Sequence, residues 1–177
     1  MRARLASKNA NKLRELRQAR PDWELELLDA NDYPPEDGRT YYDNAVAKAR
    51  FGRAHATDWV LGEDSGIEVA ALGGRPGVES ARWAEDGVAA LLDVLKGVED
   101  RRARYVCELV ALSPEGEERR GTGSVEGTIA LEPRGSEGFG YDPIFIPEGE
   151  SRTVAELGND WKRDHSHRAL AARALNL

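Results

Sequence analysis

The stretch RYVCELVALSPEGEERRGTGSVEGTIAL, residues 104–131, consists of two runs typical of strands separated by a polar segment. Arg104–Leu112 is rich in apolar and β-branched residues, and Gly121–Leu131 alternates small or polar with apolar positions, so each run predicts a strand. The intervening SPEGEE has the proline and glycine of a turn. The sequence therefore predicts a β-hairpin whose two strands share one sheet.

Strands and helices alternate on both sides of this hairpin. We predict further strands at Arg2–Ala6, Trp23–Leu28, Trp59–Leu61 and Ile67–Leu72, with an acidic turn between the last two. We predict helices at Asn9–Ala19, Thr40–Ala56, Gly87–Lys96, Thr153–Leu157 and Ser166–Leu175. Because hairpins and crossover helices both occur, an α/β or α+β fold with a mixed sheet is favoured. No repeat or linker interrupts the chain, so residues 1–177 are expected to form a single domain.

Composition narrows the class of protein. The 177 residues are 40% hydrophobic and 32% charged, and no apolar run is long enough to cross a bilayer. The formal net charge of −7 argues against a broad nucleic-acid surface. Cys107 is the only cysteine and lies in an apolar run, where a small buried thiol is expected. The charged N-terminal stretch lacks a secretory signal, so we expect a cytoplasmic protein that binds neither nucleic acid nor membrane.

The stretch LASKNANK is a candidate anion site, because it joins a predicted strand to a predicted helix. Backbone N–H groups at a helix N-terminus favour phosphate, and Lys12 adds a mobile positive charge. The spacing of a P-loop is absent. The alternative is that Asn9 only caps the helix while Lys12 is solvated.

Two pairs of acids are candidate metal ligands. Glu36 and Asp37 precede a predicted helix, and Glu63 and Asp64 follow the apolar Trp59–Leu61. Mg²⁺ is typically held by one or two carboxylates together with substrate phosphates, and a nearby carboxylate can activate water. We expect Asp64 at the end of a strand, where sites are built. For Glu36 and Asp37 alone, solvated surface charge is the alternative.

Two further stretches offer groups for recognition of a base. In GFGYDPIF the glycines permit close backbone approach, and Phe139 offers a flat apolar face, although aromatic residues in such a stretch are often core. WKRDHSHR, residues 161–168, is a basic cluster in an acidic protein. Its histidines have no accompanying cysteine, so recognition of an anion or base by Lys162 and Arg168 is favoured over a metal site.

Taken together, SKNANK, EDGRTYYDNAVAKAR, GEDSGIEVAALGGRPGVESAR, GFGYDPIF and SHRALA occur in the order seen in the inosine/xanthosine triphosphate pyrophosphatases. The chain resembles this family over nearly its whole length. The resemblance implies a two-lobed α/β structure with a long twisted mixed sheet flanked by helices and the active site between the lobes. It also implies hydrolysis of ITP, dITP and XTP to the monophosphate and pyrophosphate, with Mg²⁺, by a homodimer that removes deaminated purines from the nucleotide pool.

The same resemblance assigns roles residue by residue. Triphosphate binding falls on Ser7, Lys8, Asn9, Ala10, Asn11 and Lys12, with Lys48 near the same phosphates and Ser65 as a further substrate contact. Base recognition falls on Phe139, Gly140, Tyr141, Asp142, Lys162, His167 and Arg168. Metal binding falls on Glu36 and Asp64, and Asp64 is also the expected proton acceptor for the attacking water.

Three positions depart from the family pattern, and two other functions remain open. Lys8 stands where a small residue is usual, Glu63 replaces an aspartate, and Ala169 stands where glycine is common. A related pyrophosphatase of the Maf type would act on modified pyrimidine triphosphates. A regulatory module would bind nucleotide without cleaving it.

Overall fold

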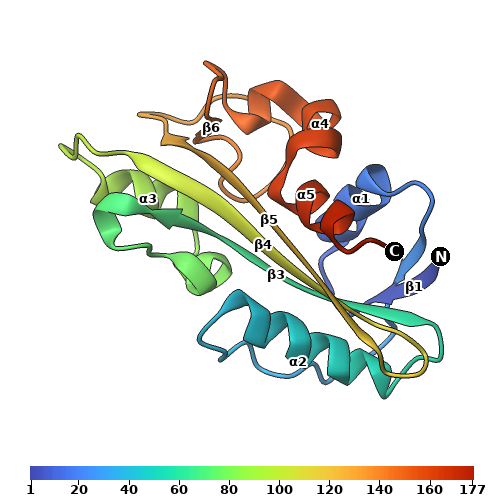
Figure 1. Ribbon diagram of the computed structural model, residues 1–177. Helices are drawn as coiled ribbons and strands as arrows, with labels where there is room; N and C mark the ends of the chain where they lie inside the picture. The colour runs from blue at the N-terminus through green and yellow to red at the C-terminus, as the bar shows by residue number, and fades with distance from the viewer.

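Six strands form one sheet in the order β2-β1-β3-β4-β5-β6 in the computed structural model, which describes residues 1–177 (Figure 1). The strands are β1 (Arg2–Leu5), β2 (Glu24–Leu27), β3 (Trp59–Val69), β4 (Arg102–Leu112), β5 (Glu118–Ile129) and β6 (Phe145–Pro147). β1 pairs in parallel with β2 and β3, and the remaining pairs are antiparallel. The predicted mixed sheet and the β4–β5 hairpin are confirmed.

The strand order places a crevice at the carboxyl end of β1. The chain leaves β1 for β2 on one side and later returns to β3 on the other, so the direction of winding reverses at β1. Ligands of open α/β sheets bind outside the carboxyl ends of strands at such a reversal. Here that place lies just after Leu5, where α1 begins.

Helices cover both faces of the sheet. They are α1 (Ala10–Ala19), α2 (Tyr41–Arg53), α3 (Gly87–Val94), α4 (Val154–His165) and α5 (His167–Ala174), with the short 3₁₀ helices η1 (Ala70–Leu72) and η2 (Gly77–Arg82). α2 packs under β3 and β4, whereas α1 and α5 lie on the opposite face (Figure 1). The largest apolar cluster joins Leu5 and Leu61 of the sheet to Leu16 of α1 and Ala171 of α5. None of these helices combines the length and the apolar character needed to cross a lipid bilayer.

The predicted acidic turn between two strands is wrong. Trp59–Val69 is one continuous strand, so the acids lie at its centre and do not end it. β1 pairs with β3 only as far as Leu61, and beyond that point one edge of β3 has no strand beside it except for a bridge at Glu68. The polar residues of β3 therefore lie where the sheet opens at the carboxyl end of β1.

Successive side chains of β3 point to opposite faces, as the pleat of a strand requires. Glu63 contacts Lys12 of α1 and Arg168 of α5, whereas Asp64 contacts Asn44 and Lys48 of α2. The two adjacent acids thus belong to two different clusters, one on each face of the sheet.

Gly62 allows α2 to approach β3 closely. A Cβ atom at this position would lie 2.0 Å from the carbonyl oxygen of Ala45 and 2.6 Å from the amide nitrogen of Ala49. Both are backbone atoms of a packed helix, so Gly62→Ala must push α2 away from the sheet. We expect it to destabilise the fold by about 1–3 kcal/mol, measured by urea unfolding. Ser124→Ala, on an exposed position of β5, should change the unfolding free energy by less than about 0.5 kcal/mol. Equal effects of the two variants would refute the close approach.

The predicted helix Thr153–Leu157 is wrong in its extent. The chain continues from Val154 to His165 as α4, with a break at Gly158, whose φ is 82°. Glu137 accepts hydrogen bonds from the backbone and side-chain nitrogens of Asn159 at 2.9 and 2.8 Å, which restarts the helix after the break. This second part of α4 carries Lys162 into the interior.

Candidate active site

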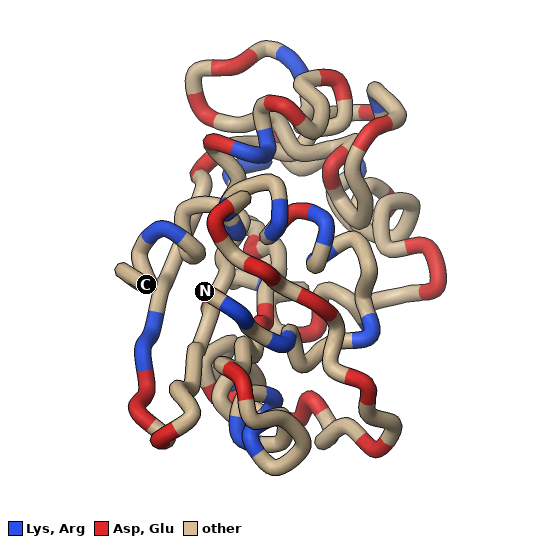
Figure 2. Tube along the Cα trace, turned by 90° about the vertical axis from the view of Figure 1, so that its right-hand side faces the viewer, with Lys and Arg blue, Asp and Glu red and all other residues tan.

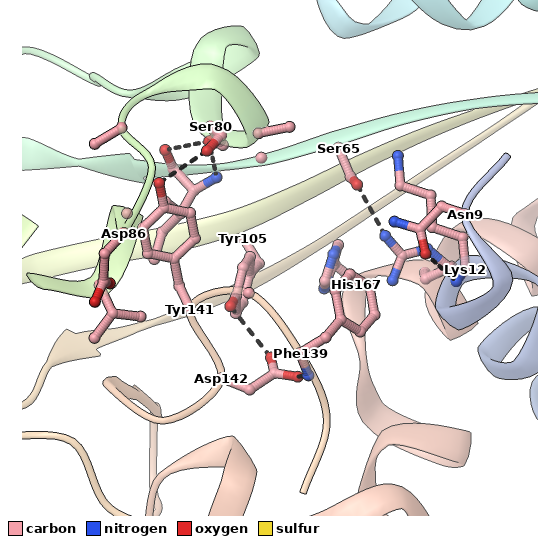
Figure 3. Close-up of a pocket in the computed structure, with 18 of the residues that line it drawn as sticks. Asn9, Lys12, Ser65, Ser80, Asp86, Tyr105, Phe139, Tyr141, Asp142 and His167 are labelled. Carbon is pink, nitrogen blue, oxygen red and sulfur yellow. Dashed lines mark hydrogen bonds between the residues drawn. The ribbon is translucent and has the colours of Figure 1, made fainter. Parts of the chain in front are cut away.

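A cavity of about 540 Å³ opens beside the free edge of β3 (Figure 3). It lies between that edge, the η2–α3 connection, the segment 139–142 and the facing ends of α1, α4 and α5. Of the predicted site residues, those that line it are Asn9, Lys12, Ser65, Phe139, Gly140, Tyr141, Asp142, Lys162, His167 and Arg168. The structure therefore brings the predicted base-recognition set together with two residues of the predicted triphosphate segment.

The segment 139–142 is fixed by the carboxylate of Asp142. Its Oδ2 atom accepts a hydrogen bond from the backbone N–H of Phe139 at 2.9 Å and pairs with the ammonium of Lys162. Its Oδ1 atom accepts from the hydroxyl of Tyr105 at 3.2 Å. Burial is the largest influence on Asp142 and raises its pKa, although Lys162 opposes the shift. These contacts hold the ring of Phe139 4.8 Å from the Lys162 ammonium.

Acidic and basic residues are interspersed along the trace in Figure 2, yet tertiary contacts gather buried charges in and beneath the wall of the cavity. Arg168 donates through Nη2 to Glu63 at 2.9 Å and to the hydroxyl of Ser65 at 2.9 Å, and it also pairs with Glu15. Glu15 in turn pairs with Lys162. Burial disfavours the Arg168 cation, but the two glutamates outweigh burial and raise its pKa. The side chains of Arg168, Glu15 and Lys162 are each at most 3% exposed, so each charge depends on its partners.

The predicted triphosphate segment is divided by the structure. Asn9 caps α1, accepting hydrogen bonds from the backbone N–H groups of Asn11 and Lys12 at 2.9 and 3.3 Å. Lys8 points elsewhere: its ammonium donates to the carbonyl of Asn31 at 2.9 Å. Ser7 accepts from the backbone N–H of Asn9 at 3.1 Å. Ser7, Lys8, Ala10 and Asn11 do not line the cavity, and only Asn9 and Lys12 of this segment do.

A second cluster lies on the α2 side of β3. Asp64 accepts a hydrogen bond from the side-chain amide of Asn44 at 2.9 Å, and its Oδ1 atom is 3.5 Å from the ammonium of Lys48. Lys48 also pairs with Glu36 and donates to the backbone carbonyl of Glu63 at 2.8 Å. Arg82 reaches Glu36 from η2 at 3.1 Å. The structure thus joins Glu36, Lys48 and Asp64, but outside the cavity lining.

The pKa values in this cluster are moved in different directions. Burial is the main cause that raises the pKa of Asp64 above its usual value, and Lys48 only partly offsets it. Burial also opposes ionisation of Glu36, but Lys48, with smaller contributions from Lys12 and Arg82, lowers the pKa of that carboxyl. Burial disfavours the Lys48 cation, while Asp64, Glu63 and Glu36 together raise its pKa. Asp64 is therefore the stronger proton acceptor of the two clustered acids.

The donor set of this cluster fits a hard divalent cation. Glu36 and Asp64 present carboxylate oxygens toward one shared cation, the Lys48 ammonium. No group of three or more histidine, cysteine, aspartate or glutamate side chains has the geometry of a metal site. Two carboxylates that share one cation match the protein ligands with which Mg²⁺ is typically held together with substrate phosphates.

His167 lies flat against Tyr105 at the inner wall of the cavity (Figure 3). The ring centroids are 4.5 Å apart and the planes differ by 7°. Burial and then the neighbouring Arg168 lower the pKa of His167 well below its usual value. The imidazole is therefore neutral near pH 7.

The buried neutral imidazole should make stability depend on pH. The unfolded chain protonates His167 below about pH 6.5 and the folded chain does not, so the unfolding free energy falls as the pH drops through that value. Between about pH 7.5 and about pH 5.5 we expect His167→Asn to lose about 1 kcal/mol less unfolding free energy than the wild type, measured with urea. The exposed His55 provides the control, since His55→Asn leaves the buried His167 and its contribution in place. An unaltered pH dependence in His167→Asn would contradict the assignment.

The cavity and its supports include residues that sequence reasoning missed. Glu15 holds Lys162 and Arg168, Tyr105 holds Asp142 and His167, and Asn44 holds Asp64. Glu15 carries no signal in the sequence, because its burial beside Leu16 on α1 is known only from the structure. Tyr105 and Asn44 carry none, since their partners are remote in the sequence.

The mixed sheet defines an α/β protein whose cavity lies where the direction of winding reverses. Because lysines and an aromatic ring line this cavity, it is a site for a phosphorylated aromatic ligand. The chain belongs to the Ham1 family, whose sequence model matches residues 3–176. It is 42% identical to a dITP/XTP pyrophosphatase of Bdellovibrio bacteriovorus, over 96% of this chain and 93% of that protein. A dITP/XTP pyrophosphatase of Deinococcus deserti is 40% identical, over 97% and 86%.

Solved structures agree with this assignment. The Ham1 protein of Staphylococcus aureus superposes with a TM-score of 0.84 at 34% identity, covering 98% of this chain and 95% of that one. A nucleoside-triphosphatase or dITP/XTP pyrophosphatase of Mycobacterium abscessus gives a TM-score of 0.75 at 41% identity, covering 99% and 97%. The expected resemblance in sequence and in fold is confirmed.

Proposed function

We propose that this chain hydrolyses dITP, ITP and XTP to the nucleoside monophosphate and pyrophosphate, as the names of its dITP/XTP pyrophosphatase relatives suggest. The observation that carries the proposal is the cavity itself. An aromatic face at Phe139 and the donors of Arg168 share it with Lys12, and Asp64 lies one residue before the lining Ser65. The cavity therefore offers groups for a base and a phosphate, while the proposed proton acceptor, Asp64, lies on the α2 face of the same strand.

Base choice follows from hydrogen-bond polarity. The guanidinium of Arg168 offers only donors, and its Cζ atom lies 5.5 Å from the centroid of the Phe139 ring. A purine stacked on Phe139 and bearing a 6-oxo group would accept where adenine donates. Sites built around such hydrogen bonds can discriminate by about 10⁴-fold, because the wrong base leaves buried polar groups unpaired.

Cleavage requires a positioned water and neutralised phosphates. Asp64 would take the proton of the attacking water, and its raised pKa suits that role. Lys12 and Lys48 would offset the charge of the triphosphate. Glu36 and Asp64 are the residues that would hold Mg²⁺, whose charge favours binding of the triphosphate and departure of pyrophosphate.

The resemblance also leads us to propose a homodimer located in the cytoplasm. A free, fully buried Cys107 is compatible with a reducing compartment. Sedimentation equilibrium of the purified chain tests the dimer: twice the chain mass of 19.5 kDa is expected, and a single-chain mass at all concentrations would contradict it.

A pyrophosphate-release assay over ITP, dITP, XTP, ATP, GTP and UTP, with Mg²⁺ or with a chelator, tests the proposed reaction. We expect release from the first three nucleotides and loss of release on chelation. Preference for UTP or modified pyrimidines would favour the Maf type. Thermal stabilisation by ITP without pyrophosphate release would favour a regulatory module.

A further inference from the structure

Glu63 is a buried carboxylate that reaches two cations through separate oxygen atoms. Its side chain is 0% exposed, Oε2 lies 2.6 Å from the ammonium of Lys12, and Oε1 accepts from Nη2 and Nε of Arg168 at 2.9 and 3.1 Å. Lys12 is the only cation in contact with Oε2, and Lys48 acts on the carboxylate from a longer distance. Burial raises the pKa of Glu63, but the cations Lys12 and Arg168 outweigh burial and hold the pKa well below its usual value.

The two cations serve different ends of the cavity. Lys12 lies in the first turn of α1 beside the capping Asn9, where phosphate is expected to bind. Arg168 lies over the ring of Phe139 and donates to Ser65 and Glu15. Lys12 has no carboxylate other than Glu63 within 4.0 Å. The side chain of Glu63 is therefore a direct electrostatic link between the phosphate end and the base end.

We propose that Glu63 is a positioning residue that couples phosphate binding to base recognition through its shared ion pairs with Lys12 and Arg168. This inference rests on the proposed function and deepens it. If Lys12 is lost, the buried Oε2 atom has no cation and the carboxylate turns toward the Arg168 guanidinium. That movement displaces the guanidinium from Ser65 and from the edge of a bound base. Lys12, which does not reach the base, thereby affects which base is accepted.

Lys48 offers a matched control on the opposite face of the sheet. Lys48 is a buried lysine that is likewise expected to act on the phosphates, and it pairs with Glu36 and Asp64. Its contact with Glu63 is to the backbone carbonyl, at 2.8 Å, and not to the side chain. Its loss should therefore weaken phosphate handling while the geometry of Arg168 is kept.

The experiment compares kcat/KM for ITP and ATP in the wild type, Lys12→Met, Lys48→Met, Glu63→Gln and the double variant Lys12→Met/Glu63→Gln. We expect Lys12→Met to reduce the ITP:ATP preference by about tenfold, a usual size for a coupled pair. Lys48→Met should lower both values by the same factor and leave the preference unchanged. In the Glu63→Gln background, Lys12→Met should no longer alter the preference.

An unchanged ITP:ATP preference in Lys12→Met, or an equal loss in Lys48→Met, would overturn the coupling. The comparison of the two lysines decides the matter even where Glu63→Gln fails to fold. The ratio of the affinities for IMP and AMP, measured by calorimetry, reports base preference without the cleavage step. Lys12→Met should lower this ratio as well. Absence of pyrophosphate release from ITP by the wild type would defeat the proposed function, whereas the IMP:AMP affinities would still test the coupling.

Discussion

Asp64→Asn is expected to reduce kcat for ITP by about 10³-fold while the fold and the affinity for ITP are kept, because a positioned general base typically contributes 10²–10⁴-fold. The amide can still accept the hydrogen bond from Asn44, 2.9 Å away in the wild type, but it cannot take a proton from water. Turnover is measured by pyrophosphate release, and affinity by calorimetry in the presence of Ca²⁺ in place of Mg²⁺.

Asp37→Asn is the matched control for this loss. Asp37 is an exposed acid next to Glu36, and no ion pair or side-chain hydrogen bond involves it. Its substitution removes the same formal charge, so it separates a general electrostatic effect from loss of the base. Asp64→Asn with undiminished turnover, or Asp37→Asn with the same loss, would refute the role assigned to Asp64.

Arg168→Ala is expected to destabilise the folded chain by about 3–5 kcal/mol, because it leaves the carboxylates of Glu63 and Glu15 buried without their shared cation. For a chain of this length, such a loss lowers the melting temperature by about 10 °C. Differential scanning calorimetry measures it. Base preference in this variant has to be determined below the lowered melting temperature.

Arg173→Ala, in the same helix α5, provides the comparison. Arg173 is about half-exposed and pairs at 3.0 Å with the similarly exposed Asp164. Exposed pairs contribute about 0–1 kcal/mol, so this variant should melt close to the wild type. A melting temperature of Arg168→Ala that matches that of Arg173→Ala would mean that the buried carboxylates do not depend on Arg168.

The architecture of the sheet is largely predictable from the sequence. The main error of that prediction has a local cause. Apolar alternation and turn residues identify the β4–β5 hairpin because pairing within a hairpin depends on nearby residues. The sequence predicts a turn at the centre of β3 because glycine, serine and two acids are typical of turns. Those residues are tolerated in a strand here because β1 ends at Leu5 and leaves that edge of β3 open to the cavity.

The site was predictable as a set of motifs but not as a set of contacts. The resemblance names the residues around Phe139 and Arg168 that the structure brings into one cavity. It also groups Lys12, Lys48 and Asp64, although β3 separates Lys12 from the other two. Glu15 escapes because its partners Lys162 and Arg168 are about 150 residues away in the chain, and only tertiary packing brings them within reach.

The pleat of β3 also makes this strand sensitive to its own length. One residue inserted between Leu61 and Glu63 would shift the side-chain period, so Glu63 would point toward α2 and Asp64 toward α5. Arg168 would then face a shorter acid, and Asn44 would lose the aspartate it holds. Insertions are therefore tolerated far better in the β4–β5 turn at residues 113–117 than in this central strand. In the strand, a shift of one residue exchanges the side chains that face α5 with those that face α2.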